Sequence, residues 1–292
     1  MRKQEFAARL AAGVLIADGA TGSCLLDAGM PRGVPTPLWL EEHPEVLIRL
    51  QRAYVAAGSH AVYAPTFHAN RICHRQQSID RDVRASVRAM VALSREAVGD
   101  APVYIAGDMG ATGVLPQPFG PLGYDELFDA YAEQAQALAE AGVDFLAAET
   151  LVTAEEGVAL LDAAASVCDL PVVCTMTVEA DGGLMLGGSV FAAAADLEAM
   201  GAAAVGVNCS VGPDQLEAVV AGIRARVQVP VAAKPNAGMP VITERGETVY
   251  PMGPEAFAAH MRRLRAAGAG YLGGCCGAGP AYIRALCQAL EL

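Results

Sequence analysis

The chain has 292 residues, of which 53% are hydrophobic and 18% are charged, and its formal net charge is −12. This acidic balance excludes a surface that attracts nucleic acid or an anionic membrane, and no apolar run is long enough to cross a bilayer. Eight cysteines are too few for a disulfide scaffold, so the composition favours reduced thiols and the cytoplasm.

The predicted elements alternate between short apolar runs and longer amphipathic segments. The chain opens on a segment in which Glu5 and Arg9 interrupt the apolar residues, so we expect a helix rather than a signal peptide. The following apolar runs are continuous, which is typical of parallel strands buried on both faces. We expect strands at 14–17, 61–64, 103–107, 145–148, 172–177, 203–207, 231–234 and 271–273.

Helix signals separate these strands. Thr153 and Glu156 have the spacing of a capping box, and Pro254 and Pro280 mark two further helix starts. After the sixth strand, five apolar residues share one helical face: Leu216, Val219, Val220, Ile223 and Val227. Eight strand–helix units without a proline-rich or serine-rich linker predict one (β/α)8 TIM barrel, a single domain over residues 1–292.

A regular spacing locates the expected active site. Four glycines suit the left-handed position after a helix: Gly58, Gly142, Gly201 and Gly268. Seven or eight residues further along lie four polar residues: Thr66, Glu149, Cys209 and Cys275. Catalytic groups of such barrels lie at the carboxyl ends of the strands, so we expect these side chains around one mouth.

Three cysteines stand in motifs that suit a metal ion. Cys275 and Cys276 are adjacent in the glycine-rich segment 273–277, and Cys209 lies in the segment 207–210. Adjacent cysteines close a disulfide only with strain, whereas three thiolates leave one position open on a tetrahedral zinc ion. Free cysteine is also common in protein cores, but the flanking glycines indicate an exposed turn and favour the metal.

Asn236 follows the strand that is expected to lie between the two cysteine motifs. Its side chain is placed to give a fourth metal ligand in the absence of substrate, or a hydrogen bond to the other ligands. The alternative is a simple turn, because asparagine is frequent in turns near glycine. The glycine-rich segment 107–113 after the third strand lacks the features of a dinucleotide-binding loop, and we expect it to face the substrate.

Taken together, these motifs resemble the homocysteine S-methyltransferase family. Five motifs carry the resemblance, which runs from Asp18 to the last helix: DGATG at 18–22, PTF at 65–67, ET at 149–150, GVNCS at 206–210 and GGCCG at 273–277. The segment PNAGMP at 235–240 is most similar to the homocysteine-binding module of cobalamin-dependent methionine synthase. The family fold is a (β/α)8 barrel, which agrees with the strand count.

The resemblance implies that Cys209, Cys275 and Cys276 bind Zn²⁺ and form the catalytic centre. Zinc would hold the homocysteine sulfur as a thiolate, the form that attacks a methyl group to give methionine. A non-enzymatic alternative is a regulatory barrel that binds zinc or thiols. The retained Asp18 and Glu149 argue against it, because a structural zinc prefers four protein ligands.

The resemblance also implies contacts to the amino-acid end of the substrate. Asp18 and Glu149 would hold the ammonium group, the N–H groups of Gly19 and Ala20 would bind the carboxylate, and Thr66 would line the same pocket. A carboxylate directly after the apolar run 145–148 must be paired or functional. On the sequence alone, Asp18 is equally well explained as a helix-capping or turn residue.

The sequence leaves the identity of the methyl donor undecided. No adenosylmethionine loop and no folate or cobalamin domain is recognisable, so the leading hypothesis is a methyl-corrinoid, free or on a separate protein that docks at the mouth. Docking predicts an exposed apolar patch there. The alternatives are S-methylmethionine, betaine or another small donor, with homocysteine, another small thiol or a selenol as acceptor.

Three positions depart from the family pattern. Ala278 and Ala64 stand where the family usually has threonine or a similar residue, which removes hydroxyl groups near the site. Lys234 stands where the methionine synthase module has histidine, and it adds a cation near the thiolates or on the donor's approach. His68, next to the PTF motif, is a candidate for the pocket wall.

Overall fold

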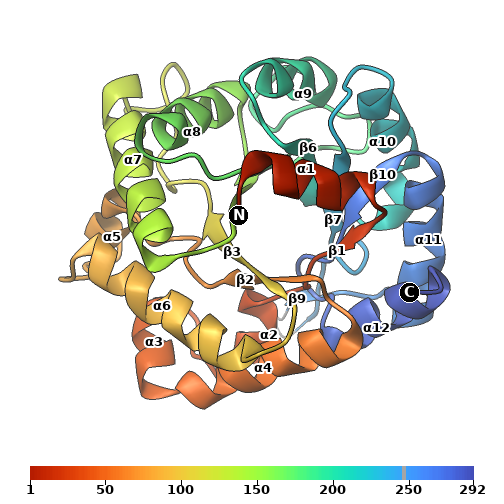
Figure 1. Cartoon of the computed structure of the whole chain (residues 1–292), viewed down its shortest axis with the longest axis horizontal. Coiled ribbons are helices and arrows are strands. Elements are labelled where there is room, and N and C mark those ends of the chain that lie inside the picture. Colours follow the sequence, from red (N-terminus) through yellow and green to blue (C-terminus); the bar gives the residue numbers. More distant parts are fainter. Residues whose placement is uncertain (245–247) are drawn as a thin grey trace.

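The computed structural model of the chain describes residues 1–244 and 248–292. Eight parallel strands form one sheet in the order β1-β10-β7-β6-β5-β4-β3-β2. A parallel bridge between Ala17 and Ala61 joins the two outer strands, so the sheet closes on itself, and helices surround it (Figure 1). This architecture is the (β/α)8 barrel that the sequence predicts.

The barrel strands lie within two residues of the predicted runs, except at the end of β4. Their bounds are β1 Leu15–Ile16, β2 Ala61–Ala64, β3 Tyr104–Met109, β4 Phe145–Leu151, β5 Val172–Met176, β6 Ala204–Cys209, β7 Val231–Pro235 and β10 Ala269–Leu272. Strands β3 and β6 extend two residues beyond the predicted runs because partners are still available: Asp108 pairs with Ala147, and Cys209 pairs with Pro235.

Twelve α-helices are present in the described residues. Their bounds are α1 Lys3–Ala11, α2 Gly22–Asp27, α3 Thr36–Glu42, α4 Pro44–Ala57, α5 Arg71–Gln76, α6 Val83–Val98, α7 Tyr124–Ala141, α8 Ala154–Val167, α9 Val190–Ala199, α10 Glu217–Arg224, α11 Pro254–Ala266 and α12 Pro280–Ala289. The predicted starts are confirmed: Thr153 accepts a hydrogen bond from the Glu156 N–H, and α11 and α12 begin at prolines. None of these helices combines the length and apolar character needed to cross a membrane.

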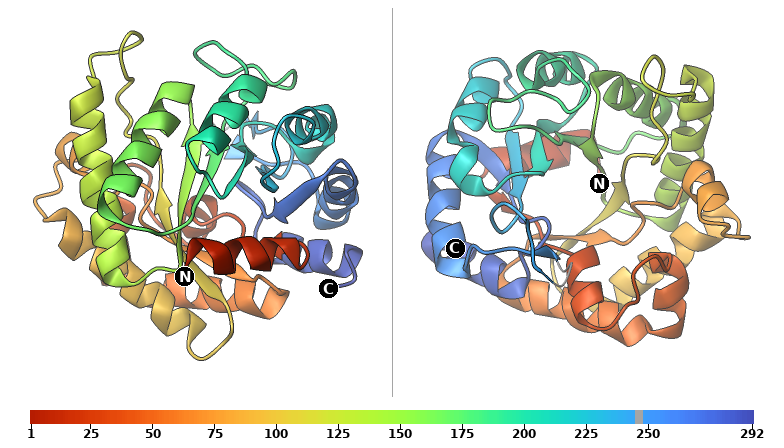
Figure 2. Two further views of the ribbon diagram at one scale, coloured as in Figure 1. Left: turned by 45° about the horizontal axis from the view of Figure 1, so that its top comes forward. Right: turned by 180° about the vertical axis from the view of Figure 1, so that it is seen from behind.

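Helix α1 closes one end of the barrel. Its residues Phe6 and Leu10 are buried against the inward-facing strand residues, and the rings of Phe6 and Phe145 lie 4.9 Å apart. Figure 1 shows α1 lying across this end, and the right-hand view of Figure 2 shows the molecule from the other side. The functional cavity therefore belongs to the opposite end, where the carboxyl ends of the strands meet.

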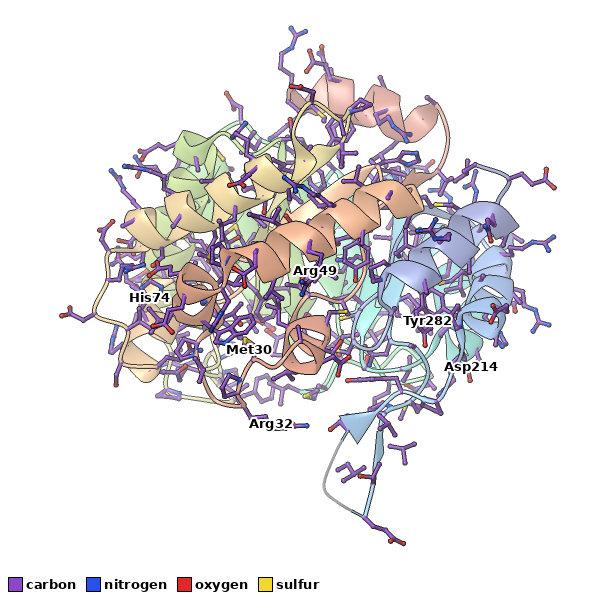
Figure 3. The ribbon with its side chains drawn as sticks, turned by 90° about the horizontal axis from the view of Figure 1, so that it is seen from below. Met30, Arg32, Arg49, His74, Asp214 and Tyr282 are labelled. Carbon is purple, nitrogen blue, oxygen red and sulfur yellow. The ribbon has the colours of Figure 1, made fainter. Side chains whose placement is uncertain are left out.

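A short hairpin projects from that opposite end. It consists of β8 Val241–Ile242 and β9 Thr248–Val249, which pair antiparallel. Figure 3 shows the hairpin extending away from the barrel on the side remote from α1. The sequence does not predict this hairpin, because strands of two residues leave no hydrophobic period to detect.

Candidate active site

The open end of the barrel holds a cavity of about 340 Å³. Most of the predicted site residues border it: Asp18, Gly19, Ala20, Glu149, Cys209, Cys275 and Cys276. His68 also borders it, as proposed. Two chemically different groups meet at this cavity, and we call them the thiol cluster (Cys209, Cys275 and Cys276) and the carboxylate cluster (Asp18, Asp108 and Glu149, with Lys234).

The sulfur atoms of the thiol cluster lie within 4.8 Å of one another. Hydrogen bonds from Cys209 and Cys275 lower the pKa of Cys276 to about 3. The same bonds, from Cys209 first and then from Cys276, raise the pKa of Cys275 well above its ordinary value. The free cluster thus favours one shared negative charge, and a cation is needed to hold all three thiolates. Three converging, partly exposed sulfur donors fit Zn²⁺ and leave a position for a fourth ligand.

The backbone at Cys209 is strained and held by its neighbours. Cys209 and Ser210 have φ of 60° and 49°, a left-handed conformation that costs about 1–3 kcal/mol for such residues. On one side, Asn208 accepts from the Thr150 N–H and donates to the Thr150 hydroxyl, both at 2.8 Å. On the other side, the Ser210 hydroxyl donates to the Val178 carbonyl at 2.7 Å. These bonds fix the direction in which the Cys209 thiol points.

The turn that carries Cys275 and Cys276 packs closely on the end of β1. A Cβ atom on Gly19 would lie 1.9 Å from the Ala278 carbonyl oxygen, and one on Gly274 would lie 2.5 Å from the Ala278 Cβ. Only glycine permits this approach at either position. The Gly274 N–H donates to the Asp18 carbonyl at 3.0 Å, which ties the cysteine turn to the carboxylate cluster.

Tyr250 lies beside the thiol cluster and was not predicted from the sequence. It follows β9, and its ring lies over Gly277, where a Cβ atom would approach it to 2.4 Å. Burial, then the charge on Cys276 and a hydrogen bond to that thiol, raises the pKa of Tyr250. The segment after the hairpin is therefore in direct contact with a predicted metal ligand.

The carboxylate cluster arises from the alternation of side chains along the strands. Ala106, Ala147 and Ala232 face the barrel interior. Two residues further along β3, β4 and β7 stand three charged residues: Asp108, Glu149 and Lys234. Because successive side chains in a strand point to opposite faces, these three also point inward, above the layer of alanines.

Asp18 is a buried cavity residue rather than a helix cap. Its Oδ2 accepts a hydrogen bond from the Tyr63 N–H at 2.8 Å, and the residue is fully buried. The capping alternative is wrong, because α2 begins after Thr21. Burial, opposed by Lys234 and by the Tyr63 bond, raises the pKa of Asp18 to about 7.

Lys234 lies among the carboxylates and pairs with Glu149. Its Nζ is 2.8 Å from Glu149 Oε2 and 3.3 Å from the centre of the Tyr63 ring, and the residue is 2% exposed. Burial opposes the charge on Lys234, but Glu149 and then Asp18 outweigh it and raise the pKa of the ammonium. Lys234 is therefore a permanent internal cation of this cluster.

Asp108 is the second residue that the sequence analysis missed. It borders the cavity, it is buried, and its Oδ1 has no hydrogen-bond partner within residues 1–244 and 248–292. Burial, and then the charge of Glu149, raises its pKa well above the ordinary value. Gly99 ends α6 with a positive φ of 57°, but Asp108 lies nine residues later, outside the spacing of seven or eight residues used above. Of the segment 107–113, which we expected to face the substrate, Asp108 on β3 is the residue that borders the cavity.

Three predicted residues make contacts that differ from the expected ones. Thr66 is absent from the cavity wall, and its hydroxyl donates to the Asp108 carbonyl at 2.8 Å, which joins β2 to β3. The Ala20 N–H, expected to bind the substrate carboxylate, instead donates to the Ala278 carbonyl at 3.0 Å. Asn236 donates through Nδ2 to the Ser210 carbonyl at 3.2 Å, and its buried Oδ1 has no partner in the described part of the chain.

Residues 15–290 match the family model described as homocysteine S-methyltransferase. A methionine synthase of Mycobacterium leprae (strain TN) is 31% identical over 298 residues, which cover 96% of this chain and 24% of that protein. A second methionine synthase, from Mycobacterium tuberculosis, is 30% identical over 95% of this chain and 24% of that protein. The chain thus spans about a quarter of the length of these relatives.

Two further similarities involve proteins closer to this chain in length. S-methylmethionine–homocysteine S-methyltransferase BHMT2 of Pongo abelii is 30% identical over 298 residues, which cover 95% of this chain and 78% of that protein. The metallated form of the homocysteine methyltransferase MmuM from Escherichia coli superposes with a TM-score of 0.77, covering 94% of this chain and 95% of the other at 22% identity. At that identity, the structural match supports the barrel fold.

Proposed function

The chain belongs to the homocysteine S-methyltransferase family, and from this premise we propose that it methylates homocysteine to methionine in a zinc-dependent reaction. One observation carries the proposal: a cluster of three thiols and a cluster of buried carboxylates border one cavity. The first suits a sulfur-binding metal ion, and the second suits the ammonium group of an amino acid.

The thiol cluster would hold the metal through Cys209, Cys275 and Cys276. Zinc, when bound, lowers the pKa of the substrate thiol so that the sulfur reacts as a thiolate near neutral pH. Asn236 is the candidate for a fourth ligand without substrate, supported by its buried, unpartnered Oδ1. Because the three thiols must stay reduced, we place the protein in the cytoplasm.

The remaining residues orient the substrate. Asp18 and the carboxylates beside it attract the ammonium, and the Gly19 N–H is the backbone donor left for the substrate carboxylate. In the transfer, a bond forms between the substrate sulfur and the methyl carbon while the bond from that carbon to the donor breaks. Fixing the amino-acid end holds the sulfur in line for this displacement. A neutral thioether would be a poorer ligand for such an ion than a thiolate, which would favour release of the product.

A methyl-corrinoid is the donor that we propose. The resemblance of PNAGMP at 235–240 to the methionine synthase module supports it. Exposed apolar side chains on and beside the hairpin also support docking of a corrinoid protein: Met239, Val241, Ile242 and Val249, of which Ile242 is 74% exposed. They lie close in sequence to Tyr250, which contacts Cys276.

S-methylmethionine is the second candidate donor. The observation that favours it is the similarity to BHMT2 of Pongo abelii, whose name gives S-methylmethionine as its donor and of which this chain covers 78%. The short solvent-facing hairpin and the cavity of about 340 Å³ also leave room for a small sulfonium compound.

One experiment separates these proposals. Purified protein is assayed for zinc content and for methionine formation from homocysteine with methylcobalamin, S-methylmethionine and betaine in parallel. Zinc at about one ion per chain with methionine from methylcobalamin supports the leading proposal. If methionine forms only from S-methylmethionine, then this compound, and not a methyl-corrinoid, is the donor. Zinc without turnover on any donor would favour the regulatory barrel, and a reduced protein that binds no zinc would end the proposal.

A further inference from the structure

The ring of Tyr250 packs on the turn that carries Cys275 and Cys276. A Cβ atom on Gly277, the residue after Cys276, would lie 2.4 Å from Cγ of this ring, so a larger residue would push the ring away. Gly277 also has a φ of 79°, a conformation that favours glycine. The shape of the turn therefore admits the ring and places Tyr250 beside a predicted metal ligand.

Hydrogen bonds hold the segment that carries Tyr250 in this place. The N–H of Met252, two residues further along, donates to the Ala237 carbonyl at 3.1 Å, and the Ala237 N–H donates to the Cys276 carbonyl at 3.0 Å. The hydroxyl of Tyr282 on α12 donates to the Met252 carbonyl at 2.8 Å. The segment is therefore tied both to a helix of the barrel and, through Ala237, to the backbone of Cys276 itself.

Three side chains hydrogen-bond to the sulfur of Cys276: Cys209, Cys275 and Tyr250. The first two are predicted ligands, and a cysteine that binds a metal ion does so as a thiolate, which has no proton to donate. The hydrogen bonds between the thiols are therefore lost when a metal ion binds. The hydroxyl of Tyr250 is a phenol and keeps its proton near neutral pH, so its bond to Cys276 is the one of the three that remains.

We propose that Tyr250 is a positioning residue of the metal site, whose hydroxyl donates a hydrogen bond to the Cys276 thiolate in the metal-bound protein. The inference rests on the proposed function. Such a bond fixes the direction of the sulfur and withdraws part of its negative charge. Tyr250 is not among the described residues that border the cavity, so it acts through Cys276 and not on the substrate.

The support for Cys276 differs in kind from the support for Cys209. The side chains of Asn208 and Ser210 bond to backbone groups of the neighbouring strands and hold the chain on either side of Cys209. Tyr250 acts on a sulfur atom directly. Hydrogen bonds to a cysteine sulfur change the electronic properties of the metal site as well as its geometry, and this gives the inference its own spectroscopic signature.

The test uses Co²⁺ as a probe, because this ion takes the place of zinc at thiolate sites and, unlike zinc, gives an absorption spectrum. The reduced, metal-free protein is titrated with Co²⁺, and the wavelength of the sulfur-to-cobalt charge-transfer band is recorded. Zinc affinity is measured separately, by competition with a chromophoric chelator. Neither measurement requires a substrate or a methyl donor, so both are independent of turnover.

Tyr250→Phe is the decisive variant, because it keeps the ring over Gly277 and removes only the hydroxyl. We expect the charge-transfer band to move to longer wavelength, since a thiolate that has lost a hydrogen bond gives up an electron more easily. Zinc affinity should fall about 10–100-fold, as is typical when a group that supports a metal ligand is removed.

Two further tyrosines provide matched controls. Tyr282→Phe loosens the same segment by removing the bond to Met252, but it leaves the hydroxyl of Tyr250 in place, so the band should keep its wavelength. The hydroxyl of Tyr124 bonds to Asp162 on the surface at 2.6 Å, so Tyr124→Phe should change neither the band nor the zinc affinity.

The inference is overturned if the band keeps its wavelength in Tyr250→Phe. An equal shift in Tyr282→Phe overturns it as well, because Tyr250 would then act through packing alone. An unchanged protein that binds neither Co²⁺ nor zinc ends both this inference and the proposed function. Failure of the proposed function alone is read separately, as a band and a zinc affinity that depend on Tyr250 in a protein that transfers no methyl group from any donor.

Discussion

The thiol cluster and the carboxylate cluster both concentrate negative charge at one cavity, but they neutralise it differently. The thiol cluster contains no cationic side chain among its described contacts, so the proposed metal ion would have to neutralise it. The carboxylate cluster contains its own cation, Lys234, which is buried against Glu149. On this proposal, an added ion would neutralise the thiol cluster, whereas folding alone already places a cation in the carboxylate cluster.

Loss of a thiol should have the largest effect, because nothing else in that cluster can hold the ion. Cys276→Ser should abolish stable zinc binding and reduce methionine formation by more than about a hundredfold, beyond the effect of changing a residue that only supports a ligand. Zinc content after dialysis and initial rates measure this. Cys168→Ser, which changes a cysteine away from the cavity, is the control and should keep both properties. Full zinc content in Cys276→Ser would refute the assignment of ligands.

Removing the internal cation should damage folding rather than metal binding. Lys234→Met leaves Glu149 buried without its partner, so we expect the free energy of unfolding to fall by about 3–5 kcal/mol. Urea denaturation of the metal-free protein measures the change. The double variant Lys234→Met/Glu149→Gln should recover part of the loss, since neither charge is then left alone. Equal stability of the single and double variants would show that the pair contributes nothing.

The pH dependence of stability should distinguish the carboxylate cluster from an ordinary surface. The pKa of Asp18 is about 7 in the folded protein, because of burial, and about 3.9 in an unfolded chain. The folded state therefore binds more protons between these values, so this contribution to stability is complete below pH 4 and is lost as the pH rises through 7.

The comparison with Asp18→Asn isolates that contribution. The stability of the unchanged protein, relative to the variant, should fall by a few kcal/mol between pH 4 and pH 7.5, about 1.4 kcal/mol for each pH unit separating the two pKa values. Urea denaturation at a series of pH values measures the difference. A constant difference across this range would mean that Asp18 is ionised throughout.

The smallest effect is expected from the hydrogen bonds that support Cys209. Asn208→Ala removes both bonds to Thr150 and should lower zinc affinity about 10–100-fold, without removing a ligand. Competition with a chromophoric chelator measures the affinity. Asn70→Ala is the control, because Asn70 caps α5 and should affect stability but leave zinc affinity unchanged.

The sequence predicted the barrel and the thiol cluster for a shared reason. Continuous apolar runs and left-handed glycines are local signals, and they fix where each strand ends. Cys209, Cys275 and Glu149 stand directly at those ends, so counting along the chain was enough to bring them together. The zinc-binding role of the cysteines and the ammonium contact of Glu149 remain predictions.

The carboxylate cluster was harder to predict because it depends on contacts across the barrel. Lys234 was noticed as a departure from the family pattern, but its pairing with Glu149 depends on side chains from β4 and β7 that meet inside. Asp108 was hidden because the apolar run stops at Gly107, whereas pairing with β4 carries the strand to Met109. Tyr250 follows a hairpin too short to leave a pattern.

The packing of α1 into the closed end of the barrel sets a limit on chain length for any ligand. Phe6, Phe145 and the hydrogen-bonded hydroxyls of Tyr63 and Tyr271 fill the interior beneath the carboxylate cluster. Because protein interiors are close-packed, these side chains cannot move to make the cavity deeper for a longer ligand or shallower for a shorter one. A thiol that is held at both ends must therefore fit a fixed distance. The number of methylene groups between its nitrogen and its sulfur thus determines whether it binds.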